Sequence, residues 1–222
     1  MTGIVDYNAG NVKSVERALS FLGAPFVRSS LPADLEKCDR LLFPGVGEAS
    51  YAMDMLRSFS LDGFLKNWAK ENRSLLGICL GSQIIFDESE EGNGTKCLGL
   101  ISGTVRHFSS VWKENVDLKV PHMGWSSVSI QNGGSPLLDG IEDGTDFYFV
   151  HSYLIQPKDS SVVKACADYG CAVPACVSSG SVTAFQFHPE KSGKAGLRIL
   201  LNFVKDDVDF DSVLQKIGGN NA

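Results

Sequence analysis

The chain has 222 residues, of which 43% are hydrophobic and 21% are charged, a composition that is typical of a folded globular protein. Its 20 basic and 26 acidic residues give a formal net charge of -6 at pH 7, which argues against a nucleic-acid-binding protein. No apolar run approaches the roughly 18 residues that a membrane-spanning helix needs, so we expect no membrane segment.

The cysteines favour a reducing, cytoplasmic location. Their even number, 6, permits disulfides, but Asp6 interrupts the only apolar stretch near the N-terminus, so no secretory signal is expected. Cys166, Cys171 and Cys176 are evenly spaced, yet the second pair of cysteines or histidines that a zinc site needs does not accompany them. We therefore expect buried thiols, and neither a metal nor a cofactor.

Apolar runs and helical repeats alternate along the first half of the chain. We expect strands at residues 3–7, 26–28, 40–43 and 74–78, and helices at residues 11–22, 61–68 and 83–88. This alternation predicts a parallel sheet covered by helices. Strand-like runs dominate from about residue 105, at residues 118–120, 127–130, 147–153, 162–167 and 182–187. We expect these strands to extend the sheet or to pack beside it, followed by a helix at residues 195–204, in a single α/β domain that spans residues 1–222.

The first chemical signal is Gly77-Ile78-Cys79-Leu80-Gly81, which follows an apolar strand and precedes a predicted helix. In this context a G-x-C-x-G sequence indicates a nucleophile elbow, a sharp turn that exposes its central side chain. The start of a helix favours the thiolate, and the following backbone N–H groups stabilise an oxyanion. The alternative is a buried cysteine between two glycines that allow close packing.

The second signal is His188-Pro189-Glu190 at the end of a predicted strand. Pro189 favours extended backbone at His188, and side chains two residues apart in extended backbone share a face. The carboxylate can then orient the imidazole, which serves as the base for a cysteine nucleophile. Taken alone, this sequence is more typical of a surface turn.

The third signal is Pro44-Gly45-Val46-Gly47, which follows the strand at residues 40–43. Parallel strands bring this loop to the same sheet edge as Cys79, where it can supply N–H groups to an oxyanion. It lacks the third glycine of a dinucleotide-binding fingerprint, and no phosphate-binding loop is present in the chain. A simple tight turn is the alternative.

These motifs resemble those of the class I (triad) glutamine amidotransferases, and among them the glutaminase subunits of imidazole glycerol phosphate synthases. The resemblance covers nearly the whole chain and includes segments 6–11, 44–47, 77–83, 88–92, 121–125, 148–153 and 188–192. Segments 121–125 and 149–153, with the sequences Pro-His-Met-Gly-Trp and Phe-Val-His-Ser-Tyr, are the ones that indicate the subfamily. One departure is Ser126, where the family commonly has asparagine.

The resemblance implies a three-layer fold, with a mostly parallel central sheet, helices on both faces and additional antiparallel strands in the C-terminal half. It implies that Cys79 attacks the side-chain amide of glutamine, with His188 as base and Glu190 as its orienting group. Backbone N–H groups of Val46, Gly47 and Leu80 would hold the oxyanion. The residues implied to bind glutamine are Gly47, Gln83, Glu91, His151, Ser152 and Tyr153.

The resemblance also implies a heterodimer in which ammonia passes to a β/α-barrel synthase (cyclase) subunit of histidine biosynthesis. The residues implied to line that interface are Pro121, His122, Met123, Trp125, Tyr148 and Lys191. His122 and His151 can instead be simple packing residues. Three functions stay open besides this one: the glutaminase of another amidotransferase, such as one of a surface-sugar pathway, a stand-alone γ-glutamyl cysteine hydrolase, and a non-catalytic binding protein.

Overall fold

The computed structural model describes residues 1–8, 11–113 and 116–204. Along the chain the elements are β1 (Thr2–Val5), α1 (Val12–Leu22), β2 (Phe26–Ser29), α2 (Pro32–Leu35), β3 (Arg40–Gly45), α3 (Ala49–Ser58), α4 (Leu61–Lys70), β4 (Ser74–Cys79), α5 (Leu80–Gln83), β5 (Glu88–Ser89), η1 (Glu91–Asn93), β6 (Thr95–Lys96), β7 (Gly103–His107), α6 (Phe108–Val111), β8 (His122–Ile130), η2 (Pro136–Leu138), β9 (Thr145–His151), β10 (Tyr153–Pro157), η3 (Ser160–Val162), β11 (Val163–Asp168), β12 (Ala172–Ser179), β13 (Val182–Phe185), η4 (Pro189–Lys191) and α7 (Gly193–Val204). No helix in the described ranges is long and apolar enough to cross a membrane.

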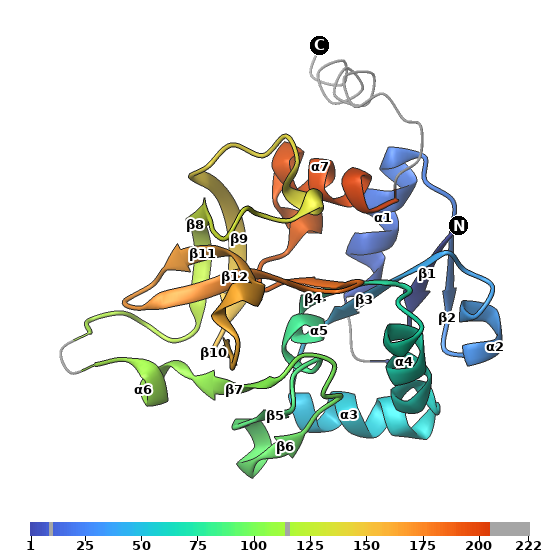
Figure 1. The fold of residues 1–222 in the computed structure, drawn as a ribbon, viewed down its shortest axis with the longest axis horizontal. Coiled ribbons are helices and arrows are strands. Elements are labelled where there is room, and N and C mark those ends of the chain that lie inside the picture. The colour runs from blue at the N-terminus through green and yellow to red at the C-terminus, as the bar shows by residue number, and fades with distance from the viewer. Residues whose placement is uncertain (9–10, 114–115, 205–222) are drawn as a thin grey trace.

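A central sheet runs through the molecule in the strand order β2-β1-β3-β4-β13-β12-β11-β8-β9. The strands from β2 to β13 pair in parallel, and the strands from β13 to β9 pair antiparallel. A smaller sheet, β10-β7-β5-β6, packs beside the central one (Figure 1). The later strands were expected to extend the parallel sheet or to pack beside it, and both occur: β8, β9, β11, β12 and β13 extend it, and β7 and β10 lie in the smaller sheet.

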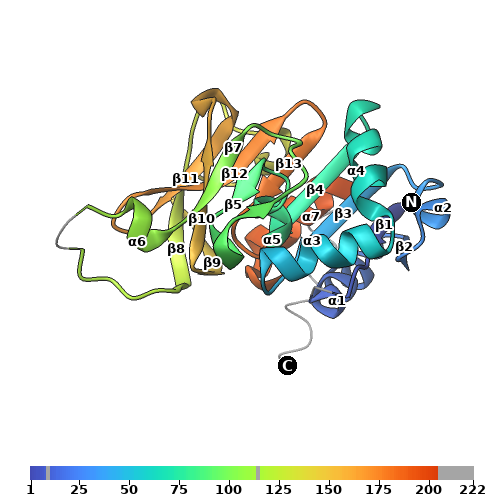
Figure 2. The same cartoon turned by 90° about the horizontal axis from the view of Figure 1, so that it is seen from below.

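Helices cover both faces of the parallel strands. Helices α1 and α7 lie on one face, and α3 and α4 cross the other, as the view from below shows most clearly (Figures 1 and 2). Each face has its own core because side chains alternate along a strand: in β3, Leu42 joins the cluster under α1 and α7, and Leu41 joins the cluster under α3 and α4. This arrangement is the predicted three-layer α/β fold.

Two predicted elements are wrong, and the chain's tertiary contacts give the reasons. Of the predicted helix at residues 83–88 only Gln83 is helical, because α5 ends there and the carbonyls of residues 84–86 accept hydrogen bonds from N–H groups of residues 98–101 instead. Residues 118–120 form no strand, since pairing begins only at His122, after Pro121, which has no N–H to donate.

Other elements differ from the prediction in extent. The run at residues 147–153 is split at Ser152, so that its two halves, β9 and β10, belong to different sheets. Helix α3 and strand β12 were not predicted. Strand β12 contains Pro174 and small side chains, which conceal the strand in the sequence.

The start of α5 packs directly against β3. A Cβ atom on Gly81 would overlap the carbonyl oxygen of Phe43, and a Cβ on Gly77 would lie 2.8 Å from the carbonyl oxygen of Gly81. Because the two clashing groups are backbone atoms, no side chain can rotate away to make room. Glycine at these positions is what allows the helix to turn back so closely on the sheet.

We expect Gly81→Ala to lower the free energy of unfolding by roughly 1–3 kcal/mol, the usual cost of overpacking a filled interior. Gly63→Ala in α4 is the matched control, because a Cβ there meets nothing within 4 Å. Alanine in a helix is favoured over glycine, so the control should be neutral or stabilising. Equal unfolding midpoints of the two variants in urea would contradict this account of the packing.

Candidate active site

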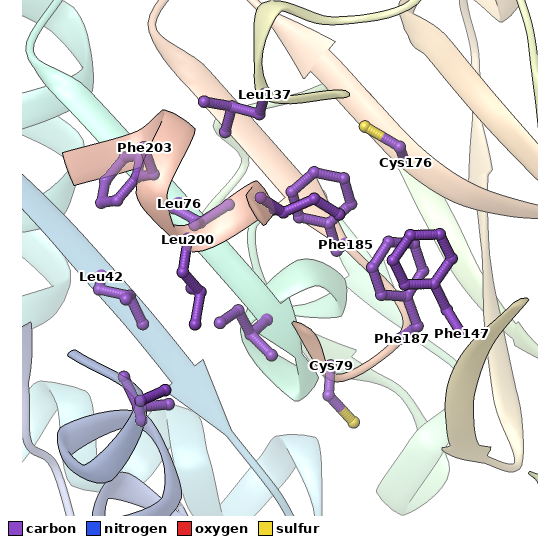
Figure 3. Packing of buried hydrophobic residues seen from close by; sticks show 14 of the residues in the cluster. Leu42, Leu76, Cys79, Leu137, Phe147, Cys176, Phe185, Phe187, Leu200 and Phe203 are labelled. Atoms are coloured by element: carbon purple, nitrogen blue, oxygen red, sulfur yellow. The ribbon is translucent and has the colours of Figure 1, made fainter. Parts of the chain in front are cut away.

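Cys79 lies at the turn between β4 and α5 with φ 54° and ψ -111°, a conformation that residues with a side chain rarely adopt. The turn brings the cysteine to the carboxyl end of the parallel strands. Its sulfur points away from the phenylalanines that pack beside it, including Phe185 and Phe187 (Figure 3). The thiol lies 3.9 Å from the carbonyl oxygen of Val150. The predicted elbow geometry is therefore present.

His188 and Glu190 form a buried pair beside this cysteine. The Nδ1 atom of His188 is 2.7 Å from Oε1 of Glu190, and both side chains are 2% exposed. The other ring nitrogen, Nε2, is buried and has no hydrogen-bond partner among the described residues. The carboxylate thus orients the imidazole through Nδ1, and Nε2 is available to exchange a proton.

The surroundings of His188 favour its protonated form. Burial alone lowers the pKa of His188, but the side chains of Cys79 and Glu190 act in the opposite direction and raise it to about 9. Cys79 and His188 line the same pocket. An imidazolium beside the sulfur stabilises the thiolate, which is the nucleophilic form of cysteine.

Strand β9 and a short helical turn hold His188 in place. The N–H of His188 donates to the carbonyl oxygen of Tyr148 at 2.9 Å. The hydroxyl of Ser192 donates to the carbonyl oxygen of His188 at 2.7 Å and accepts from the N–H of Tyr148 at 3.0 Å. These bonds fix the backbone on both sides of the imidazole.

The loop at residues 44–47 lies beside the elbow because β3 and β4 are adjacent, with Gly45 opposite Cys79. The buried hydroxyl of Tyr7 donates to the carbonyl oxygen of Pro44 at 3.0 Å and holds the start of the loop. Gly47 has φ 99°, which favours glycine over any other residue. The loop therefore reaches the same sheet edge as Cys79, as its position after a parallel strand predicts.

A pocket of about 440 Å³ opens at this edge of the sheet. It is lined by Val46, Gly47, Cys79, Leu80, Gln83, Glu91, Pro121, Val150, His151, Ser152, Tyr153 and His188. All the residues implied to hold the oxyanion or bind glutamine are among them, although they come from separate parts of the chain. Val150 also lines the pocket, although an apolar residue within a strand does not indicate a binding role from sequence.

Several lining side chains are fixed by hydrogen bonds. The amide of Gln83 donates to the carbonyl oxygen of Tyr153 at 2.9 Å and to Oε1 of Gln186 at 3.0 Å. Oε2 of Glu91 accepts from the N–H of Ala49, the first residue of α3, at 2.7 Å. Burial raises the pKa of Glu91, and this hydrogen bond opposes the rise. The pocket wall is thus preorganised by contacts that the sequence pattern does not reveal.

An exposed apolar patch, formed by Met123, Trp125 and the ring of Tyr148, lies on strands β8 and β9. Met123 and Trp125 are 61% and 57% exposed, and the rings of Trp125 and Tyr148 are 6.0 Å apart. Nζ of Lys191 lies 5.9 Å from the centre of the Tyr148 ring. His122, which the resemblance groups with these residues, is instead buried beneath them at 1% exposure.

The cysteines form no metal centre in the described residues. All six are free thiols, and no group of three or more histidine, cysteine or acidic side chains in the described ranges is arranged to hold a metal ion.

The profile of the family Glutamine amidotransferase class-I matches residues 4–206. The chain belongs to this family. It is 48% identical to imidazole glycerol phosphate synthase subunit HisH of Geobacillus kaustophilus (strain HTA426), over 92% of this chain and 96% of that protein. It is 47% identical to the subunit of the same name from Bacillus velezensis (strain DSM 23117 / BGSC 10A6 / LMG 26770 / FZB42), with the same coverage. A solved glutamine amidotransferase structure has the same fold, with a TM-score of 0.70, 20% identity and coverage of 92% of this chain and 99% of that one.

In this amidotransferase the six thiols differ in environment. Burial raises the pKa of the five thiols other than Cys79, and that of Cys97 rises to about 12. Cys79 is the cysteine that lines the pocket and has an imidazole beside it. Cys79 should therefore react with an alkylating agent faster than the other five cysteines.

We expect iodoacetamide at neutral pH to label Cys79 in preference to the other cysteines, as measured by peptide mass spectrometry. Glu190→Gln removes one of the groups that raise the pKa of His188, so less imidazolium stabilises the thiolate and the labelling should slow by about tenfold. Glu142→Gln, at an exposed site, is the control. Faster or equal labelling in Glu190→Gln would contradict the proposed electrostatic link.

Proposed function

We propose that this chain is the glutaminase subunit of an imidazole glycerol phosphate synthase and acts through a Cys79-His188-Glu190 triad. The observation that carries the proposal is the convergence of the Cys79 elbow and the buried His188–Glu190 pair on one pocket. The names of the relatives at 47–48% identity support the histidine pathway over another amidotransferase pathway.

The chemistry follows from the site. The Cys79 sulfur bonds to the amide carbon of glutamine while His188 passes a proton to the departing nitrogen, so that ammonia leaves and a γ-glutamyl thioester remains. Water, deprotonated by His188, then cleaves the carbon–sulfur bond and yields glutamate and the free thiol. Glu190 stabilises the imidazolium that gives its proton in the first step and forms again in the second. Backbone N–H groups of Val46, Gly47 and Leu80 hold the oxyanion.

The proposed substrate site uses the polar part of the pocket wall. Glutamine presents an ammonium and a carboxylate besides its amide, and a pocket that holds it needs groups of both polarities. Glu91 supplies the negative charge for the ammonium, and the segment His151-Ser152-Tyr153 and Gly47 supply polar atoms for the rest of the molecule. Gln83 lines the pocket and its amide donates to the carbonyl oxygen of Tyr153, which supports the same role.

We also propose that the apolar patch on β8 and β9 binds a β/α-barrel synthase (cyclase) subunit. Exposed tryptophan and methionine side chains are typical of protein interfaces, and Lys191 at the rim adds a charge. Pro121 lines both the active-site pocket and the neighbouring groove with Met123, so the patch adjoins the pocket. Ammonia released at Cys79 would then have a short path to the partner, away from water that protonates it.

The proposal includes a single domain at residues 1–222 and a cytoplasmic location. The single domain is supported by a core in which Leu41 of the central sheet packs in one cluster with Val105 and Ile155 of the small sheet. The location is supported by the free state of all six cysteines.

A stand-alone γ-glutamyl hydrolase is the alternative with the same triad. The exposed patch disfavours it, because a hydrolase that acts alone gains nothing from an apolar surface beside its pocket. Strong hydrolysis of γ-glutamyl peptides without any partner would favour this alternative.

We expect Cys79→Ala to lower glutamate release from glutamine by more than about a thousandfold, the usual effect of losing a catalytic nucleophile. The assay contains the synthase subunit and its ligand, and circular dichroism checks the fold of the variant. Cys166→Ala, a half-buried cysteine outside the pocket, should retain full activity. Unchanged turnover in folded Cys79→Ala would disprove the triad.

We expect Trp125→Ala to weaken binding of the synthase subunit by about tenfold or more. Tryptophans that become buried when an interface forms contribute most strongly to its binding energy. Calorimetric titration measures the dissociation constant. Leu31→Ala is the matched control, since Leu31 is 58% exposed but lies beside β2, at the opposite edge of the sheet. Equal effects of the two substitutions would place the interface elsewhere.

A further inference from the structure

A chain of hydrogen bonds connects strand β8 to the wall of the pocket. The hydroxyl of Ser126 lies 2.8 Å from Nε2 of His122, and Nδ1 of His122 lies 3.1 Å from Nε2 of His151. Nδ1 of His151 in turn lies 2.7 Å from the carbonyl oxygen of Tyr153. The chain therefore runs from a residue beside the exposed Trp125 to a residue that lines the pocket.

The direction of every bond in this chain follows from its last member. A carbonyl oxygen only accepts, so Nδ1 of His151 carries the proton, and Nε2 of a neutral His151 is then an acceptor. His122 must donate to it from Nδ1, which makes Nε2 of His122 an acceptor as well. The hydroxyl of Ser126 is the donor that satisfies this atom.

Burial and packing keep both imidazoles neutral and fixed. Burial lowers the pKa of His122 to about 4 and that of His151 to about 3, so neither ring is charged at neutral pH. The ring of His122 is stacked between Tyr169, at 4.0 Å, and Phe149, at 4.7 Å. Stacking on both faces restricts rotation of the ring.

The hydrogen-bond chain ends at the carbonyl oxygen of Tyr153, which accepts two hydrogen bonds. The carbonyl oxygen of Tyr153 accepts from His151 at 2.7 Å and from Gln83 at 2.9 Å. Ser152, between His151 and Tyr153, is the residue at which the polypeptide backbone crosses from the central sheet to the small sheet. The two bonds hold this crossing, and with it one side of the pocket.

We propose that Ser126 and His122 are positioning residues for the glutamine site: their hydrogen bonds hold His151 in one tautomer and so fix the pocket wall at residues 151–153. Neither residue touches the substrate. The inference rests on the proposed function for the identity of the ligand, whereas the tautomer itself is a property of the protein alone. It also gives a structural role to Ser126.

The test combines a spectroscopic and a kinetic measurement on the full chain. Long-range ¹H–¹⁵N spectra of histidine-labelled protein report which nitrogen of each ring is protonated. In the unmodified protein, His122 and His151 should both be neutral and carry the proton on Nδ1. In Ser126→Ala, His122 loses its donor, and both rings should shift toward a mixture of tautomers.

The same variants are assayed for glutaminase activity with the synthase subunit. Ser126→Ala should raise KM for glutamine by about fivefold, the effect of one lost hydrogen bond, with a smaller change in kcat. Ser126→Thr keeps the hydroxyl and should restore both the spectrum and KM. Ser127→Ala is the matched control, because that hydroxyl binds Asp146 at 2.6 Å, outside the chain.

The inference is overturned if either imidazole of the unmodified protein is charged or protonated on Nε2. It is also overturned if Ser126→Ala leaves the spectra and KM unchanged, or if Ser127→Ala has the same effect. A protein with the expected tautomers but without glutaminase activity would instead refute the proposed function, so the two failures are distinguishable.

Discussion

The reversal of the chain at Cys79 is the constraint on which the rest of the site depends. A side chain at φ 54° is unfavourable, and the turn persists because β4 on one side and α5 on the other are both packed into the core. The two glycines that flank the turn allow α5 to approach the backbone of β3, at Gly81, and of β4, at Gly77. The sheet thus stabilises a strained cysteine at the edge where parallel strands end.

The second half of the chain supplies the imidazole of His188 and the remaining wall of the pocket. Antiparallel strands carry the backbone back beside β4, and the bonds between β9 and the turn at residues 188–192 hold the imidazole near the sulfur. The crossing from β9 to β10 closes the pocket on the other side. The central sheet is therefore both the core of the protein and the frame that brings residues more than a hundred positions apart to one site.

Much of the fold and the site could be predicted from the sequence because the signals are local. Fully buried parallel strands appear as continuous apolar runs, and the residues Gly77, Cys79 and Gly81 identify a turn that only small neighbours permit. The proline after His188 correctly indicated extended backbone, with φ -101° and ψ 95°.

What could not be predicted depends on contacts between distant segments. Residues 83–88 have a helical pattern, but Ile84 and Ile85 are buried on all sides and their carbonyls bond to another loop. The bond between His122 and His151 joins strands whose pairing register is invisible in the sequence, and Ser126 drew notice only as a departure from the family's pattern. Tertiary contacts, not local preference, decide these features.

The measurement that tests the central claim most directly is acid quenching of the enzyme and its synthase partner during turnover of saturating glutamine, followed by mass spectrometry of the peptides. The account predicts a peptide that contains Cys79 and is heavier by one γ-glutamyl group, and this species should disappear when hydroxylamine is added to cleave thioesters. A γ-glutamyl group on any other residue, or rapid glutamate production with Cys79 never modified, would contradict the account.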